Sequence, residues 1–346
     1  MKGELSMSNI KWEKYSLLAN HPQASAWLRF QESRGLALNT VQAYAYALED
    51  YLRFCDREDI YAIDITREHI ARYIRDLNER PIKENIKRFS HSRVGLSNAT
   101  QRQRLSAIRL FYDYLEEEGW RDTNPVAKGS FRSKRGLVPA YHKLPWIPND
   151  SEWRTLLEVA RSESIRNRFM LALAYDAGLR REELCLLETR DIDPSRRLIS
   201  IRAETTKNSR ARVVPYECAT SILYVAYLRH RRRLGGKRGL LFLSESRRNF
   251  GKPISIWTWS KVVRAIAQRA ELEKFSTHTL RHLCLTDLAR AGWDIHEIAL
   301  FAGHRSIQAT LLYIHLSGRE LAAKFQLSIG KLHAWRLNLM QEVWHS

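Results

Sequence analysis

The segment from His278 to Tyr313 reads HTLRHLCLTDLARAGWDIHEIALFAGHRSIQATLLY, and the rest of the chain is organised around it. Its first part predicts a helix over residues 278–291, in which His278, Arg281 and His282 fall at i, i+3 and i+4 on one face. The opposite face can pack on a core through Leu280, Leu283, Cys284 and Ala291, with Asp287 as a polar misfit. A helix anchored on one side that presents two imidazoles and a guanidinium on the other predicts an anion site.

The charge balance points to a polyanionic partner. Lys and Arg number 57 against 38 acidic residues, which gives a net charge of +19 and a pI near 10. Nucleic acid is the commonest partner for such an excess, although a basic protein without a nucleic-acid role stays open on charge alone. With 44% hydrophobic and 27% charged residues, the 346-residue chain should be globular and long enough for two domains.

Cysteine usage and hydropathy favour a cytosolic protein. The four cysteines (Cys55, Cys185, Cys218 and Cys284) are far apart and form neither a CxxC pair nor a zinc-like spacing. The first 16 residues are polar, and no apolar run of about 18 residues is long enough to cross a bilayer. Met7 is a second possible start of the chain.

Residues 20–125 predict a helical domain without strands. The helical pattern starts near Pro22, and Trp27, Leu28 and Phe30 open a first short helix. Thr40 and Thr66 are candidate N-caps for the second and third helices. Asn98 with Gln101 resembles a capping box at the start of the fourth. Four helices over about 100 residues are enough to fold independently.

Two basic segments flank the fourth helix. The loop before it contains Lys83, Lys87, Arg88 and Arg93, and the Gly- and Pro-punctuated segment 126–144 contains Lys128, Arg132, Lys134 and Arg135. The loop reads equally as a solvated surface or as a contact to the DNA backbone, because irregularly spaced cations suit phosphates better than base edges. The second segment has the composition of an interdomain linker, and its charge suggests that it lies along a polyanion.

Residues 145–320 predict a second domain that mixes helices with one β-hairpin. An apolar helix over 165–177 is stopped by Gly178, and Arg180 follows at once. Residues 197–202 and 210–216 alternate with period two and predict a hairpin whose turn contains Lys207. Arg210 and Arg212 follow in the second strand as candidate DNA contacts. The fold class expected is mainly α with a small antiparallel β-sheet.

The residue types suit a phosphodiester substrate. Charge in the transition state of phosphoryl transfer gathers on the non-bridging oxygens, and an arginine pairs with two of these at once. Metal is the rival use of His278 and His282, but position 279 is Thr rather than the Glu of HExxH, and Arg281 would repel a cation. No nucleotide-binding glycine loop occurs, so neither a metal nor a nucleotide cofactor is expected.

Five motifs in order resemble the tyrosine recombinase family, also called phage integrases, over nearly the whole chain. They are GLRxxEL at residues 178–184, a lysine in a β-turn (Lys207), HxLRH at 278–282, Gly303-His304 and Tyr313. Two details depart from the family pattern: Phe301-Ala302 replaces the usual Leu-Leu before Gly-His, and the hairpin turn lacks its common glycines. The resemblance implies a two-domain C-shaped DNA clamp. Its parts would be a SAM-like core-binding domain (20–125), a basic linker (126–144), a catalytic domain (145–320) and a C-terminal segment (321–346).

The resemblance also implies a chemistry. Tyr313 would attack a scissile phosphate and form a 3′-phosphotyrosyl link, without ATP or metal. The other implied roles are charge stabilisation by Arg180, Arg281 and His304, proton transfer with the tyrosine by His278, a general acid in Lys207, and supporting positions for Glu183 and His282. Free tyrosine has a pKa near 10, so positive neighbours must activate it.

Assembly and biological role are implied by the same resemblance. The expected partner is a double-stranded DNA site, bound by a dimer, with a tetramer in the synapse, in the cytoplasm at the nucleoid. Integration, excision or transposition of a mobile element is the expected role, and dimer resolution, which uses the same chemistry, stays open. Residues 321–346 would either dock on a neighbouring protomer or pack within their own. A catalytically inactive DNA-binding relative and a type IB topoisomerase are the rival functions.

Overall fold

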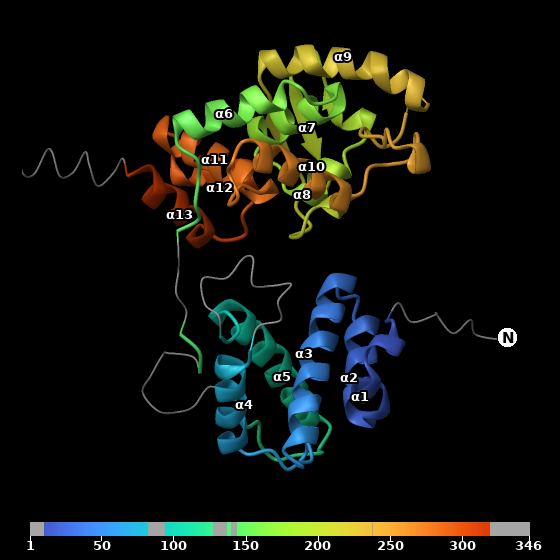
Figure 1. The fold of residues 1–346 in the computed structure, drawn as a ribbon, viewed down its shortest axis with the longest axis vertical. Helices are drawn as coiled ribbons and strands as arrows, with labels where there is room; N and C mark the ends of the chain where they lie inside the picture. The colour runs from blue at the N-terminus through green and yellow to red at the C-terminus, as the bar shows by residue number, and fades with distance from the viewer. Residues whose placement is uncertain (1–9, 82–93, 127–136, 140–143, 237, 319–346) are drawn as a thin grey trace, which may run out of the picture. The chain divides into compact units, whose positions relative to one another are not determined.

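A computed structural model describes residues 10–81, 94–126, 137–139, 144–236 and 238–318. The chain divides into two compact units, Met1–His142 and Lys143–Ser346. Both are built mainly from helices (Figure 1). Among the described residues, no helix combines the length and the apolar character that crossing a bilayer requires.

The first unit is a helical bundle around an aromatic core. Its helices are α1 (Ser16–Asn20), α2 (Pro22–Ser33), α3 (Leu38–Arg57), α4 (Arg67–Glu79) and α5 (Asn98–Glu117), preceded by the 3-10 turn Trp12–Lys14. Trp27, Tyr51, Tyr73, Phe111 and Tyr112 are fully buried between them. The Tyr112 hydroxyl donates to the Ala62 carbonyl at 2.8 Å and lies 2.7 Å from that of Tyr51, so the buried phenols satisfy each other's polar groups.

The helix starts of this unit agree with the sequence at one position and differ at three. Thr66 is the N-cap of α4, as predicted. The Thr40 assignment is wrong because α3 already begins at Leu38, with Ala37 at the N-cap. At α5 the cap is Ser97, whose hydroxyl accepts from the Thr100 amide, so Asn98 is already helical. The unit also starts before Pro22, since Ile10, Tyr15 and Leu18 belong to its core.

The residues that border the basic segment 127–136 are anchored on the first unit. Val126 and Val138 are buried in its core. The Asn98 side chain also donates to the Pro139 carbonyl at 3.2 Å. The chain predicted as linker is therefore fixed to the helical unit on both sides of its basic run.

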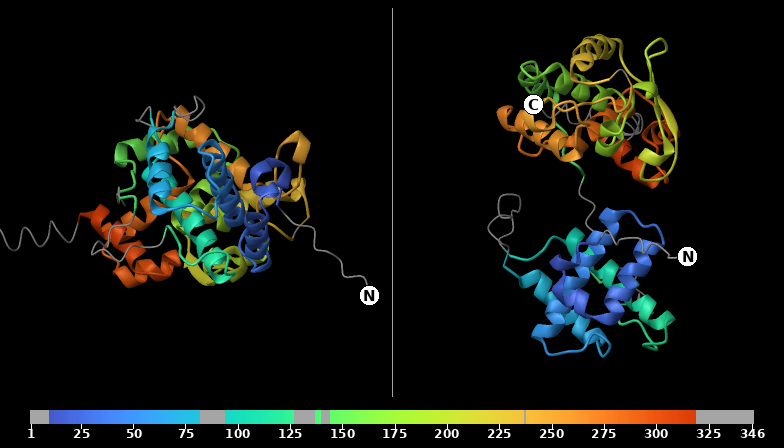
Figure 2. Two further views of the ribbon diagram at one scale, coloured as in Figure 1. Left: turned by 90° about the horizontal axis from the view of Figure 1, so that it is seen from below. Right: turned by 90° about the vertical axis from the view of Figure 1, so that its right-hand side faces the viewer.

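The second unit surrounds a small sheet with helices. It contains α6 (Asp150–Ala160), α7 (Ile165–Asp176), α8 (Arg181–Cys185), β1 (Ile192–Asp193), β2 (Leu198–Ile201), β3 (Arg212–Pro215), α9 (Cys218–Leu234), α10 (Ile256–Arg269), α11 (Thr277–Arg290), α12 (Ile295–Ala302) and α13 (Gln308–Ser317). The predicted fold class, mainly α with a small antiparallel sheet, is confirmed. Figure 2 shows the sheet edge in yellow-green beside the orange and red C-terminal helices, where α12 contacts β3.

The predicted hairpin is present and sets the register of the sheet. Strands β2 and β3 pair antiparallel, with Leu198 opposite Pro215 and Ile201 opposite Arg212. β1 adds a short third strand on the other edge of β2, which the sequence pattern did not reveal. Ile199 and Ile201 point into the core, as the period-two pattern requires.

Helix α11 packs its apolar face in the core and carries Arg281 on the other face. Leu280, Leu283 and Cys284 are buried, as predicted, whereas Ala291 follows the helix and is exposed. The polar misfit Asp287 accepts a hydrogen bond from the Tyr175 hydroxyl of α7 at 2.8 Å. α11 also packs on α12 and α13, so Arg281 is covered by protein, whereas His278 at the start of the same face is exposed.

Candidate active site

Side chains from four segments of the second unit meet around one point. The segments are the start of α8, strand β3, helix α11 and the chain from the end of α12 through α13. They bring together Arg180, Glu183, Arg212, Arg281, His282, His304 and Tyr313, as the hydrogen bonds below show. The first and last of these residues, Arg180 and Tyr313, are more than 130 positions apart in the sequence, so only the tertiary fold brings the set together.

The position of Arg180 is set by the left-handed turn at Gly178 and by hydrogen bonds to the Glu183 carboxylate. Gly178 has φ +54°, a left-handed conformation that favours glycine, and a Cβ there would lie 3.1 Å from the Phe301 ring. The Arg180 amide then donates to Glu183 Oε2 at 2.9 Å, and its Nη1 donates to Oε1 at 2.7 Å. Both the backbone and the guanidinium of Arg180 are therefore fixed by Glu183.

Arg212 binds the same carboxylate from the sheet side. Its Nη1 and Nη2 donate to Glu183 Oε1 and Oε2 at 3.1 and 2.7 Å, and its Nε donates to the Phe301 carbonyl at 2.9 Å. Burial acts to raise the pKa of Glu183, but Arg212 and Arg180 outweigh it and lower that pKa to about 2. The Arg212 side chain is 7% exposed and faces inward, which differs from the DNA contact predicted from sequence.

Arg281 is a buried cation held by carbonyl groups. Its Nη1 donates to the Gly178 carbonyl and its Nη2 to the Ala302 carbonyl, each at 2.6 Å. Within the described part of the chain it has no ion pair. Burial, followed by repulsion from Arg180, lowers the pKa of Arg281 to about 10. A charge desolvated in this way gains most when an anion binds beside it.

His304 uses both ring nitrogens. Its Nε2 lies 3.0 Å from Arg281 Nη2 and its Nδ1 lies 2.8 Å from the buried Thr310 hydroxyl. Because a guanidinium only donates, Nε2 is the acceptor and Nδ1 carries the proton of the neutral ring. Burial and the Arg281 charge lower the pKa of His304 to about 4, so the ring is neutral at pH 7.

Tyr313 lies against this cluster from α13. Its side chain is 3% exposed and stacks on the His304 ring at 5.9 Å between centroids, with 11° between the planes. Burial raises the pKa of Tyr313, and the charges of Arg281 and Arg180 offset only part of that rise. The phenol is therefore protonated at neutral pH and needs a proton acceptor before it can act as a nucleophile.

The two α11 histidines occupy different environments. His282 Nδ1 lies 3.1 Å from the Tyr313 hydroxyl, whereas His278 lies in the exposed first turn, with its ring 6.4 Å from that of His282. The sequence interpretation gave proton transfer with the tyrosine to His278 and a supporting position to His282. In the structure, the histidine that lies beside the Tyr313 hydroxyl is His282.

The hairpin turn that contains Lys207 is tethered to the site. Lys207 and Arg210 are exposed, and between them the Asn208 side chain donates to the Gly303 carbonyl at 3.4 Å. The same carbonyl accepts from Arg180 Nη2 at 3.4 Å. Sequence reasoning missed Asn208, although its place beside the turn lysine was a usable signal.

Some candidate residues fall in parts of the chain that the structure does not describe. They are Lys83, Lys87, Arg88 and Arg93 of the basic loop, Lys128, Arg132, Lys134 and Arg135 of the linker, and the C-terminal segment 321–346. Their predicted DNA or protomer contacts lie outside the described residues and stay predictions.

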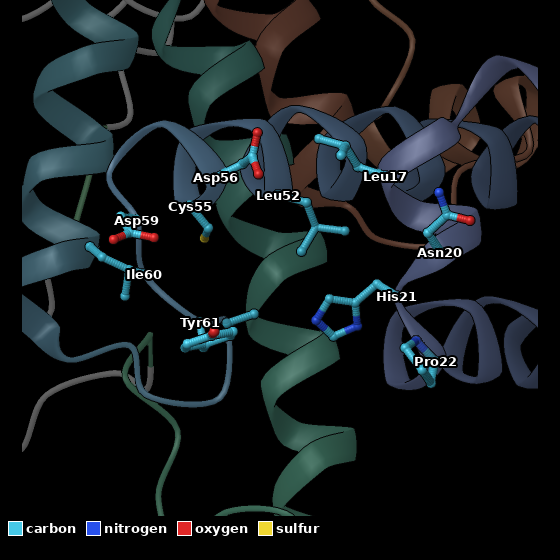
Figure 3. Close-up of a pocket in the computed structure, with 11 residues that line it drawn as sticks. Leu17, Asn20, His21, Pro22, Leu52, Cys55, Asp56, Asp59, Ile60 and Tyr61 are labelled. Carbon is cyan, nitrogen blue, oxygen red and sulfur yellow. The ribbon is translucent and has the colours of Figure 1, made fainter.

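A separate hollow of about 450 Å³ lies in the helical unit (Figure 3). His21, Cys55, Asp56 and Tyr61 are among the residues that line it. The His21 ring accepts from the Ala24 amide as the N-cap of α2, and burial raises the pKa of the Cys55 thiol to about 12. With its imidazole engaged and its thiol protonated, this hollow lacks the activated groups that converge in the second unit.

Buried guanidinium groups beside a phenol form a site suited to a phosphodiester. Family comparison agrees with this chemistry. The model of the phage integrase family matches residues 149–320, and that of the phage integrase N-terminal SAM-like domain matches residues 25–122. The chain therefore belongs to the phage integrase family and is a tyrosine recombinase, an enzyme of site-specific recombination.

Two characterised relatives cover most of the chain. Tyrosine recombinase XerD of Caulobacter vibrioides is 31% identical over 84% of this chain and 90% of its own length. Transposase A of transposon Tn554 from Staphylococcus aureus is 25% identical over 93% of this chain and 96% of its own length. The resemblance predicted from the motifs is confirmed.

Solved structures share the fold. The XerH recombinase, solved in a post-cleavage complex with its palindromic difH substrate, has a TM-score of 0.67 at 20% identity, covering 96% of this chain and 91% of its own. The Tn1549 transposon integrase, solved with transposon right-end DNA, has a TM-score of 0.62 at 15% identity, covering 82% and 92%. At these identities the likeness shows the architecture alone.

Proposed function

We propose that this recombinase cleaves and rejoins DNA through Tyr313, whose hydroxyl attacks the scissile phosphate to form a 3′-phosphotyrosyl link. The observation that carries this proposal is the placement of a buried phenol against Arg281, His304 and His282. The phosphotyrosine conserves the energy of the broken bond, so rejoining requires neither ATP nor a metal ion.

In this proposal, Arg180 and Arg281 donate to the non-bridging oxygens of the phosphate. His304 joins them when the bound anion raises the pKa of its ring and Nε2 takes up a proton. Arg281 supplies a desolvated charge, and Glu183 orients Arg180 through two hydrogen bonds. Donors fixed in a water-poor site stabilise developing charge without reorganising during the reaction, which is the largest single contribution in many enzymes. Lys207 donates a proton to the departing 5′ oxygen, from a turn tethered through Asn208.

The substrate is a double-stranded DNA site, bound through both units. The net charge of +19 supports a large phosphate-contacting surface. The helical domain (20–125), with the basic loop and the linker (126–144), contacts the backbone and leads into the catalytic domain (145–320). The XerH and Tn1549 integrase structures were solved with DNA, and a λ integrase structure is a dimer on a core site, which supports a dimer per site. In this proposal, two such dimers form a tetramer in the synapse.

A role in mobile-element recombination fits two of the relatives. Transposase A of Tn554 aligns over 96% of its length, and the Tn1549 integrase shares the fold. Integration, excision or transposition all use the same cleavage and rejoining chemistry. Because the substrate is genomic DNA, the site of action is the nucleoid in the cytoplasm. Residues 321–346 would complete the assembly by docking on a neighbouring protomer.

A suicide substrate nicked beside the cleavage point tests the proposal. Wild-type protein should become covalently linked to DNA, while Tyr313→Phe should bind the same DNA and trap none. Formation of a Holliday junction from two intact sites would separate a recombinase from a topoisomerase. Covalent trapping by Tyr313→Phe at the wild-type level would overturn the assignment of the nucleophile.

A further inference from the structure

We infer that His282 is a catalytic residue, the base that takes the proton from the Tyr313 hydroxyl during cleavage and returns it during rejoining. This inference rests on the proposed role of Tyr313 as the nucleophile. It differs from the sequence interpretation, in which His278 assists the tyrosine and His282 only supports its neighbours.

The contacts of the three histidines separate their possible roles. His282 Nδ1 is 3.1 Å from the Tyr313 hydroxyl, within hydrogen-bond reach of the proton that must leave. His304 stacks flat on the tyrosine, and both of its nitrogens are engaged, by Arg281 and by Thr310. Of these rings, His282 is the one placed to accept.

The protonation states agree with this assignment. Burial, His278 and Arg281 lower the pKa of His282 to about 4, so at pH 7 its ring is neutral and Nδ1 has a free lone pair. A neutral imidazole that accepts at Nδ1 carries its own proton on Nε2. Bound phosphate would add negative charge beside Arg180 and Arg281, which raises the pKa of the neighbouring imidazole and strengthens it as a base.

The step balances as a concerted displacement. As the Tyr313 oxygen forms its bond to phosphorus, its proton moves to His282 Nδ1 and the bond from phosphorus to the 5′ oxygen breaks. The departing 5′ oxygen takes a proton from Lys207. Transfer has to be concerted because the phenol is much less acidic than the imidazolium, and the phenolic oxygen loses its basicity only as the new bond forms. Rejoining reverses each transfer.

The arrangement also gives the accepted proton a short route to solvent. His278, whose ring lies 6.4 Å from that of His282, is exposed at the start of the same helix. The charged and titratable groups that act on His282 are His278 and Arg281 of α11 itself, His304 after α12, and Tyr313 of α13.

Two substitutions separate a base from a hydrogen-bond partner. His282→Asn places an amide near the position of Nδ1, so it can keep the hydrogen bond to Tyr313 but cannot take the proton. His282→Ala removes both functions. The matched control is His296→Gln, an exposed histidine of α12. The measurement is single-turnover covalent trapping at saturating DNA, with oxygen and with sulfur at the 5′ bridging position of the substrate.

The expected result is a loss of about 10²-fold in trapping rate for both His282→Asn and His282→Ala at neutral pH, with His296→Gln unchanged. A 5′ thiolate needs no proton to leave, so the sulfur substrate should restore Lys207→Ala but neither His282 variant. Between pH 7 and 9 the trapping rate of the His282 variants should rise about tenfold per pH unit, because hydroxide must then ionise the phenol, while the wild-type rate stays nearly flat.

Other results would overturn the inference. If His282→Asn traps DNA at the wild-type rate while His282→Ala is slow, His282 only positions the phenol. If His278→Gln, rather than His282→Asn, traps DNA slowly at neutral pH and recovers as the pH rises, His278 is the base. Trapping by Tyr313→Phe would instead show that the proposed nucleophile is wrong. If His282→Ala does not fold, the dependence of the His282→Asn trapping rate on pH is enough to test whether His282 is the base.

Discussion

Each unit of this recombinase contains a carboxylate that joins two arginines, and the two clusters differ in what they leave unpaired. In the helical unit, Asp50 pairs with Arg80 and Arg104, and it accepts from the Tyr73 hydroxyl at 2.8 Å. Arg80 also reaches Asp76. Every guanidinium of this cluster faces an acid at a partly exposed position, which is the arrangement expected of a stabilising network.

The catalytic unit departs from that balance at one residue. Glu183 pairs with Arg180 and Arg212, but the neighbouring Arg281 is buried with two carbonyl groups and the His304 ring as its partners and, among the described residues, without a carboxylate. A cation kept from water without a carboxylate costs free energy in the empty protein, and a bound anion recovers it. The Asp50 cluster therefore joins helices, whereas the Glu183 cluster fixes Arg180 beside Arg281, the arginine that we propose binds the phosphate.

The largest difference is expected for the unpaired arginine. Arg281→Ala should lower the rate of covalent trapping by about 10³-fold at saturating DNA, because it removes a fixed donor to the developing charge. Arg104→Ala is the control from the balanced cluster and should trap at nearly the wild-type rate once DNA saturates. Equal losses in the two variants would erase the functional distinction between the clusters.

The two central carboxylates should differ in stability. Glu183→Gln leaves two buried guanidinium groups without their anion and should lower the free energy of unfolding by about 3 kcal/mol. Asp50→Asn, at a carboxylate that is 19% exposed, should cost about 1 kcal/mol, since solvent screens its partners. Urea unfolding of both variants measures this, and a larger loss for Asp50→Asn would contradict the comparison.

The low pKa of Glu183 predicts that the difference in unfolding free energy between wild type and Glu183→Gln depends on pH. Its pKa is about 2 in the folded protein against 4.5 ordinarily, so the unfolded chain binds more protons between these values. Its contribution is complete above pH 4.5 and is lost as pH falls toward 2. The gap in unfolding free energy between wild type and Glu183→Gln should therefore narrow by roughly 2 kcal/mol from pH 5 to pH 3. A constant gap would show that Glu183 is not ionised in the folded state.

The smallest effect is expected at Arg212. Arg212→Lys keeps the charge but cannot bind both oxygens of Glu183, so trapping should slow by about tenfold through Arg180. DNA affinity, measured by gel shift, should stay unchanged because the side chain faces Glu183 rather than solvent. A loss of affinity with an unchanged rate at saturating DNA would restore the DNA contact predicted from sequence.

Much of the site follows from sequence because local rules position its parts. Gly178 ends a helix directly before Arg180, the alternating strands put Lys207 in a turn, and helical spacing puts Arg281 on the face of the histidines. These are short-range relations of backbone geometry and periodicity. They also gave the fold class, since helical runs dominate and one hairpin interrupts them.

What could not be predicted depends on packing between distant segments. Spacing puts His278 and His282 on one face, but which of them meets Tyr313 depends on where α13 crosses α11. Arg212 has the sequence appearance of a surface cation, and only the nearby Glu183 turns it inward. Thr40 is a good cap by residue type, yet α3 begins two residues earlier, at Leu38.

Mapping the covalent adduct tests the central claim most directly. After trapping on a nicked substrate, the protein–DNA complex would be digested with nuclease and protease, and the modified peptide would be sequenced by mass spectrometry. The account predicts a nucleotide 3′-phosphate esterified to Tyr313, which lies in the peptide between Arg305 and Arg319. An adduct on any other residue, or a link to a 5′-phosphate, would contradict it.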